Sequence, residues 1–156
     1  MKIYAVVDTN VLVAALLSKN VDSATIKVLK EISGGNIIPL YHSKILAEYT
    51  DVLNRDKFPI KKETAKGIID IVKTFGIEVE PLSTGVTLPD RDDLIFYEVM
   101  KAKEDDGAYL ITGNLKHYPR EKTIMTPAKV IGRLENVDTM DKIVKMIISS
   151  RKERNK

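Results

Sequence analysis

Apolar and polar positions along the chain follow two periodicities, one typical of strands and one typical of helices. Short β-prone runs occur at residues 2–7, 37–41, 77–80, 108–112 and 124–125. Between them, apolar residues recur every three or four positions, as on one face of a helix. These helical segments are residues 11–17, 23–33, 43–53, 61–75, 92–106 and 126 onward, followed by a last amphipathic helix at 138–149.

Alternating strands and helices predict an α/β fold, because parallel strands need long crossover connections that are usually helical. We expect a three-layer sandwich with a mostly parallel central sheet flanked by helices. Capping residues support several boundaries: Asp22 or Ser23 before the second helix, and Ser43 before the third. Thr126 and Pro127 are typical of a helix start.

The composition indicates one soluble domain. A chain of 156 residues is long enough for a single core, and no apolar run reaches the length of a membrane span. We expect a cytoplasmic protein that does not associate with membranes. The absence of cysteine excludes disulfides and thiolate metal sites, so a bound metal would be a hard cation held by oxygen or imidazole.

Charge alone says little about partners. The net charge is +3, with a basic tail at 151–156 and a basic cluster between Arg55 and Lys62. A solvated surface explains both as well as nucleic-acid binding does.

Acidic side chains stand where parallel sheets place functional sites. Asp8 leaves the first strand, Glu48 borders the apolar face of its helix, and Asp90, Asp92 and Asp93 crowd a helix start. Capping or a salt bridge explains each singly, but helix capping does not explain three acids at one helix start. Converging carboxylates repel one another and suit Mg²⁺ or Mn²⁺. His42 and His117 lack zinc spacing and are more typical of surface or packing positions.

Four blocks of the chain together resemble the PIN-domain family. Residues 6–13 resemble its opening motif, Glu48 within 43–53 its second acidic position, and residues 89–98 its third. Residues 108–114 resemble its fourth motif, although Asn114 stands where the family commonly has aspartate. The order and spacing of the blocks agree with the family over nearly the whole chain up to about the helix that starts at Thr126.

The resemblance implies catalytic, metal-ligating roles for Asp8, Glu48 and a third-motif aspartate. Asp93 is favoured because it precedes an apolar triplet, and Asp92 and Asp90 remain alternatives. Supporting roles fall to Thr9, Asn10, Thr112 and Asn114. A neutral amide at 114 is a weaker ligand than a carboxylate, which leaves one or two metal ions open.

The resemblance also implies a function and partners. We expect a Mg²⁺- or Mn²⁺-dependent endoribonuclease acting on single-stranded RNA, a toxin with an antitoxin as inhibitor, and a homodimer. The single domain would comprise a nuclease core at about 1–130 and a C-terminal helix with basic tail at 131–156. Alternatives are a catalytically weak RNA-binding module and a phosphoryl-transfer protein with Asp8 as nucleophile. A phosphoryl-transfer protein would be expected to have a second acidic residue where this chain has Asn10.

Overall fold

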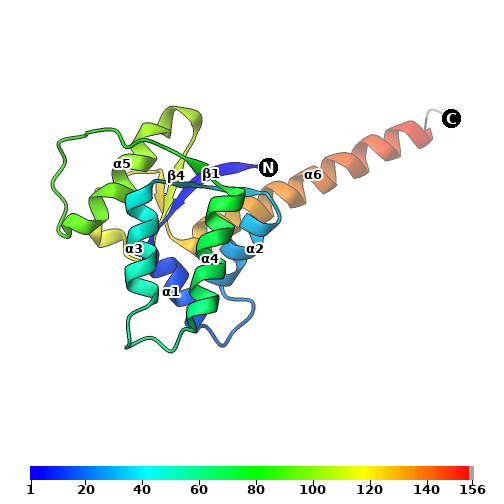
Figure 1. Cartoon of the computed structure of the whole chain (residues 1–156). Helices are drawn as coiled ribbons and strands as arrows, with labels where there is room; N and C mark the ends of the chain where they lie inside the picture. Colours follow the sequence, from blue (N-terminus) through cyan, green and yellow to red (C-terminus); the bar gives the residue numbers. More distant parts are fainter. Residues whose placement is uncertain (155–156) are drawn as a thin grey trace.

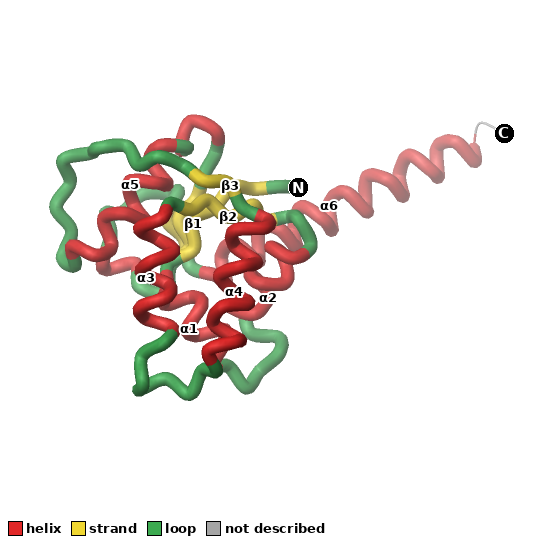
Figure 2. The backbone as a smooth tube through the Cα atoms, viewed as in Figure 1, coloured by secondary structure: helices red, strands yellow, loops and turns green. Residues whose placement is uncertain are grey.

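The five strands form one parallel sheet. The computed structural model describes residues 1–154, so the last two residues of the predicted basic tail, 155–156, lie outside it. The strands are β1 (Ile3–Val7), β2 (Ile37–Tyr41), β3 (Ile77–Glu78), β4 (Tyr109–Ile111) and β5 (Ile124–Met125), in the order β3-β2-β1-β4-β5. Every neighbouring pair is parallel. Figure 2 shows the strands, in yellow, gathered among the helices. The predicted α/β fold is confirmed, with β3 and β4 shorter than expected.

Helices connect the first four strands and cover the sheet, whereas a 3-10 turn at Leu115–His117 lies between β4 and β5. The helices are α1 (Thr9–Leu17), α2 (Ala24–Ser33), α3 (Ser43–Leu53), α4 (Lys62–Phe75), α5 (Leu94–Ala102) and α6 (Pro127–Arg154). The chain moves from β1 outward to β2 and β3, and then returns through α5 to β4 on the other side of β1. Because parallel crossovers are right-handed, this reversal places α5 on the opposite face from the helices of the first two crossovers. The reversal makes the carboxyl ends of β1 and β4 a topological switch point.

Apolar side chains bury both faces of the central strands. Val6 and Val7 of β1 and Leu110 of β4 are fully buried, as expected for strands covered by helices on both sides. Tyr49 of α3 and Phe96 of α5 pack with ring centroids 6.1 Å apart. The Tyr49 hydroxyl donates a hydrogen bond to the carbonyl oxygen of Val7. This buried contact ties α3 to the carboxyl end of β1.

Local hydrogen bonds define the helix starts. Ser23 caps α2 by accepting from the backbone N–H of Ile26, as one of the two predicted alternatives. The expected cap at Ser43 is wrong, because α3 already includes Ser43 and the His42 ring nitrogen accepts from the N–H of Lys44. The helix predicted at 92–106 is divided into a 3-10 turn at Arg91–Asp93, α5, and a second turn at Glu104–Asp106. That last turn ends at Gly107, whose φ of +83° is readily adopted only by glycine.

The C-terminal segment is one helix, and the prediction of a separate helix at 138–149 is wrong. The 28 residues of α6 continue without interruption, and no glycine or proline occurs between Leu134 and Asp138 to end the helix. Its first turns bury Val130, Ile131 and Leu134 and pack against α2, whereas the remainder extends away from the body (Figure 1). Neither α6 nor another helix within residues 1–154 has the length and apolar composition to cross a membrane.

Candidate active site at the ends of the central strands

Asp8 and Thr112 meet at the switch point of the sheet. Asp8 directly follows β1, and its backbone N–H donates to the carbonyl oxygen of Ile111 in β4 at 2.9 Å. Thr112 directly follows β4, and its hydroxyl donates to Oδ2 of Asp8 at 2.9 Å. Two residues 104 positions apart are therefore joined at the edge where open parallel sheets bind ligands.

Asp8 is a buried carboxylate held by two hydroxyls. Asp8 is only 4% exposed. Besides Thr112, the Tyr118 hydroxyl donates to Oδ2 of Asp8, at 2.8 Å. Burial raises the pKa of Asp8, and the hydrogen bonds from Tyr118 and Thr112 oppose that rise. Asp8 occupies the N-cap position of α1, but its side chain makes no capping hydrogen bond. The backbone N–H groups of Asn10 and Thr9 lower the pKa of Asp8 less than the two hydroxyls do, so capping is a minor part of its role.

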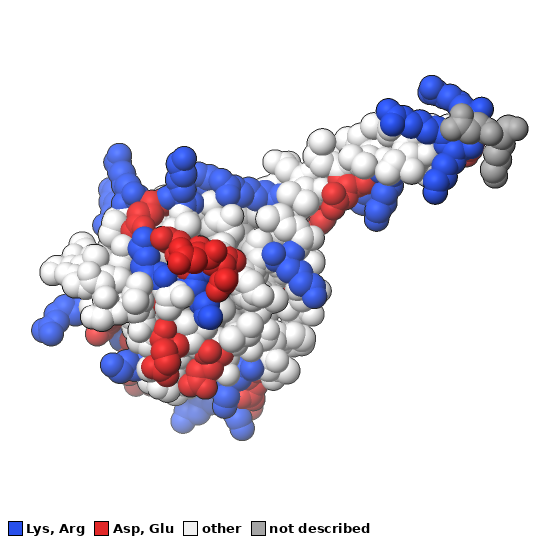
Figure 3. All heavy atoms as spheres, turned by 90° about the horizontal axis from the view of Figure 1, so that it is seen from above, with Lys and Arg blue, Asp and Glu red and all other residues white. Residues whose placement is uncertain are grey.

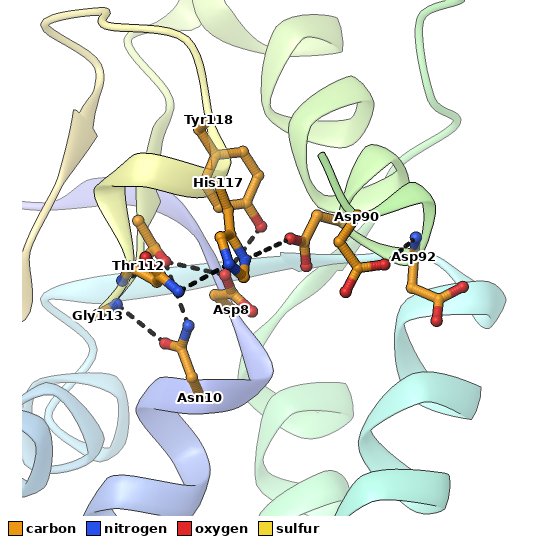
Figure 4. A network of polar contacts seen from close by, with 10 residues as sticks. Asp8, Asn10, Asp90, Asp92, Thr112, Gly113, His117 and Tyr118 are labelled. Carbon is orange, nitrogen blue, oxygen red and sulfur yellow. Dashed lines mark hydrogen bonds and ion pairs between the residues drawn. The ribbon is translucent and has the colours of Figure 1, made fainter. Parts of the chain in front are cut away.

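Asp93 supplies a second carboxylate to the same site. Burial raises the pKa of Asp93 to about 6, with further increases from the charges of Asp8 and Asp90. Asp92 is exposed, and its N–H donates to the Asp90 side chain, which caps the turn before α5. Figure 4 shows Asp92 away from Asp8. The geometry therefore favours Asp93 among the three third-motif acids.

The turn after β4 is held by a small network around Thr112 (Figure 4). The Thr112 hydroxyl oxygen accepts from the N–H of Asn114 at 3.0 Å and from the Asn10 amide at 3.4 Å. The Asn10 side-chain oxygen in turn accepts from the N–H of Gly113 at 2.9 Å. A Cβ at Gly113 would come within 3.3 Å of that oxygen, so glycine permits the close approach. Asn10 and Thr112 thus orient Asp8 and the turn.

His117 and Tyr118 are site residues that the sequence did not reveal. His117 was expected at a surface or packing position, but it also contacts Asp93. Nδ1 of His117 lies 3.0 Å from Oδ2 of Asp93, and Nε2 lies 2.9 Å from the Asn114 amide nitrogen. Because that nitrogen can only donate, these contacts assign the proton of a neutral ring to Nδ1. Both residues lie in or beside a turn, where no hydrophobic periodicity marks them.

Asn114 acts on the site through this histidine. Its amide donates to Nε2, which leaves Nδ1 of His117 to donate to Asp93. An aspartate at this position could only accept from Nε2 and would require a doubly protonated ring to keep both contacts. Asn114 can therefore keep its contact with a neutral His117 ring while that ring donates to Asp93.

Glu48 lies in a separate acidic group. Glu48 is half-buried on α3. Burial raises the pKa of its carboxyl, and the charge of Asp92 raises it further. Its surroundings include Lys44, Arg91 and Asp92, which line the same cleft. Within residues 1–154, no three His, Asp or Glu side chains lie close enough to share one ion. The three predicted ligands are thus not gathered into one cluster.

Comparison with known proteins identifies the family. The family model described as PIN domain matches residues 4–116 of the chain. The chain belongs to the PIN domain family. A crystal structure of VapBC2 from Rickettsia felis bound to a DNA fragment from their promoter shares the fold, with a TM-score of 0.51 and 18% identity over 79% of this chain and 97% of that chain. No curated protein matches the sequence.

The donors of this PIN domain suit a hard cation between Asp8 and Asp93. Mg²⁺ is commonly bound by one or two carboxylates, with waters and substrate phosphates as the other ligands, so a cluster of three acids is not required. A cation would also offset the repulsion between the two carboxylates. Thr9, the residue after Asp8, has a buried hydroxyl with no hydrogen-bond partner among the described residues.

The raised pKa of Asp93 predicts a pH-dependent stability of the metal-free PIN domain. Between about pH 4 and 6 the folded state binds more protons at Asp93 than the unfolded state, so this residue lowers stability as pH rises through that window. The stability of Asp93→Asn minus that of wild type should therefore be larger at pH 7 than at pH 4. Thermal unfolding in chelator measures this difference. A difference that is constant with pH would contradict the assignment.

Proposed function

We propose that this PIN domain is a metal-dependent endoribonuclease acting on single-stranded RNA. The observation that carries the proposal is the pairing of Asp8 and Asp93 at the switch point, where burial and the charge of Asp8 raise the pKa of Asp93. Such a pair is costly without a cation, and an Mg²⁺ or Mn²⁺ ion there would offset both charges. The nuclease core lies within about residues 1–130, and the proposed setting is the cytoplasm.

The residues of the site hold the two carboxylates in place. When bound, the ion would supply a water of lowered pKa and offset charge on the phosphate. Thr112 and Tyr118 both donate to Oδ2 of Asp8, which fixes the carboxylate. Burial raises the pKa of Tyr118, so its hydroxyl stays protonated and continues to donate. His117 holds Asp93, with Nδ1 at 3.0 Å from Oδ2.

Basic residues beside the site support a polyanionic substrate. Lys116, Arg120 and Lys122 are exposed and line a cleft of about 710 Å³ together with Tyr118. Tyr118 is shared between this cleft and the acidic pair, because its hydroxyl donates to Asp8, although neither Asp8 nor Asp93 lines the cleft. Phosphates bound by these cations would lie close to Tyr118, the residue that the cleft shares with the site. The preference for single-stranded RNA rests on the family resemblance.

We further propose that the protein is a toxin inhibited by an antitoxin. The family resemblance supports this role, and the shared fold with the VapBC2 structure is consistent with it. Co-expression with the product of an adjacent small open reading frame should give a stable complex in which RNA cleavage is suppressed. Failure of neighbouring products to bind would remove this part of the proposal while leaving the nuclease activity to be judged separately.

Cleavage of an unstructured, end-labelled RNA tests the activity. We expect cleavage with Mn²⁺ or Mg²⁺, none with chelator, and recovery when metal is restored. The second candidate function is RNA binding without cleavage, which the neutral Asn114 and the engagement of Asp93 by His117 favour. RNA binding with no cleavage in either metal would select that alternative. Neither binding nor cleavage would reject both.

Glu48→Gln should reduce cleavage by about 10-fold, the lower range for groups that tune a metal without contacting it. Burial raises the pKa of Glu48, followed by the charges of Asp92 and other neighbours but not of Asp8, which supports a role outside the central pair. Initial rates at saturating Mn²⁺ measure the effect, with Asp51→Asn as the matched control on the exposed side of α3. A loss as large as that of Asp8→Asn would instead make Glu48 a direct ligand.

A further inference from the structure

The cleft beside Tyr118 combines an apolar lining with cations. Its volume is about 710 Å³, within the range of roughly 300–1,000 Å³ that is common for pockets that take small ligands. Leu115, one of the apolar residues, is 46% exposed. The lining consists of the apolar residues Leu115, Pro119 and Ile124, the cations Lys116, Arg120 and Lys122, and also Tyr118 and Glu121. Attraction of phosphates alone would not require the apolar part.

The charge of the acidic residue in this cleft, Glu121, is offset within the protein. Lys101 of α5 forms an ion pair with Glu121, and the Tyr97 hydroxyl donates to Oε2 of Glu121 at 2.7 Å. Burial tends to raise the pKa of Glu121, but the hydrogen bonds from Lys101 and Tyr97 outweigh it and lower the pKa. Glu121 is therefore an ionised but paired carboxylate, and the three cations decide the charge that a ligand meets.

The three cations Lys116, Arg120 and Lys122 are exposed, and none of them pairs with an acidic side chain among residues 1–154. Basic side chains also crowd the outer end of α6, as Figure 3 shows. That end extends away from the body that carries Asp8 and Asp93 (Figure 1). The cleft cations are thus the ones placed to hold a substrate beside the site.

One short segment joins the cleft to the site. The 3-10 turn Leu115–His117 carries two lining residues of the cleft, and it also carries His117, which contacts Asp93. The next residue, Tyr118, lines the cleft and donates to Asp8 (Figure 4). A ligand in the cleft would therefore lie one side chain away from the acidic pair.

We propose that the cleft holds one unpaired nucleotide of the RNA next to the cleaved bond, with its base against the apolar lining and its phosphates toward the three cations. A base within a duplex is paired and stacked on its neighbours, so only an unpaired base can turn its face to such a surface. The inference rests on the nuclease proposal, because it names the form of substrate that this site takes. It gives the preference for single-stranded RNA a physical basis in this chain.

Removal of single bases tests the contact with the base. The probe is an unstructured RNA just long enough to span the cleft and the acidic pair, with one base at a time replaced by an abasic sugar, and affinity is measured in chelator. Loss of one particular base should weaken binding about 10-fold, as for other proteins that stack single-stranded bases. Pairing the RNA with its complement should also weaken binding. Equal affinity for all abasic RNAs would overturn the proposal.

Leu115→Ala identifies the surface that meets this base. It should weaken binding of the intact RNA about fivefold, because apolar contact area is lost, and should not weaken binding of the RNA that lacks the critical base. Leu82→Ala is the matched control, since Leu82 is 52% exposed and does not line the cleft. It should leave both affinities unchanged. Equal losses for intact and abasic RNA in Leu115→Ala would place the base elsewhere and overturn the proposal.

Arg120→Gln tests the phosphate contacts. It should weaken binding of every RNA alike and reduce the slope of log affinity against log salt by about 1, whereas Arg151→Gln at the outer end of α6 should not change the slope. RNA binding that depends on Leu115 and Arg120 without any cleavage in Mn²⁺ would support the cleft and reject the nuclease proposal. Cleavage that is indifferent to both residues would support the nuclease proposal and reject the cleft.

Discussion

Asp8→Asn is expected to cleave RNA on the order of 10³-fold more slowly than wild type at saturating Mn²⁺. Metal stabilisation of a phosphodiester transition state contributes several kcal/mol, and each 1.36 kcal/mol corresponds to a tenfold change in rate. The substitution keeps an oxygen that can accept from Thr112 and Tyr118 but removes the charge that would hold the ion. Single-turnover cleavage of a labelled RNA measures the loss.

Two controls separate lost chemistry from lost folding. Asp92→Asn removes a charge from an exposed carboxylate of the third motif and should change the cleavage rate by less than about twofold. The metal-free Asp8→Asn protein should unfold at a temperature no lower than wild type, because burial raises the pKa of Asp8 and its charge therefore opposes folding at neutral pH. Full activity in a folded Asp8→Asn protein would refute the assigned site.

Gly76→Ala should destabilise the fold by about 3 kcal/mol, the upper range for inserting a methyl group into a packed site. Gly76 ends α4 before β3, and a Cβ there would overlap the carbonyl oxygens of Val72 and Pro39. Both obstacles are backbone atoms, so they cannot rotate away as a flexible side chain could. The measurement is the free energy of unfolding in urea.

Gly67→Ala provides the matched control within the same helix. Gly67 is exposed in α4, and a Cβ there would meet nothing within 4 Å. Alanine should therefore stabilise the protein by about 0.5–1 kcal/mol, because glycine loses more backbone entropy in a helix. Opposite signs for the two substitutions are the expected result. Equal effects would show that the space around Gly76 does not limit the residue.

Local patterns were sufficient to predict the five strands, most of the helices and the edge of the sheet where the site lies. The apolar runs of β1 and β4 predicted buried parallel strands, and the residues directly after them, Asp8 and Thr112, do meet. Such predictions succeed because strand and helix periodicities depend on neighbours in the sequence. The carboxyl ends of parallel strands share one edge whatever the details of packing.

The sequence by itself determined the parallel α/β architecture, the acidic and oxygen-rich character of the site, and the absence of thiolate ligands. Only the tertiary structure decided that Asp93 lies with Asp8, that Glu48 lies with Asp92, and that His117 and Tyr118 complete the site. These outcomes depend on contacts between residues far apart in the chain, which no local periodicity encodes. The same reason applies to α6, whose two apolar faces have the same helical period but point in different directions, so that one packs on the body and the other remains exposed.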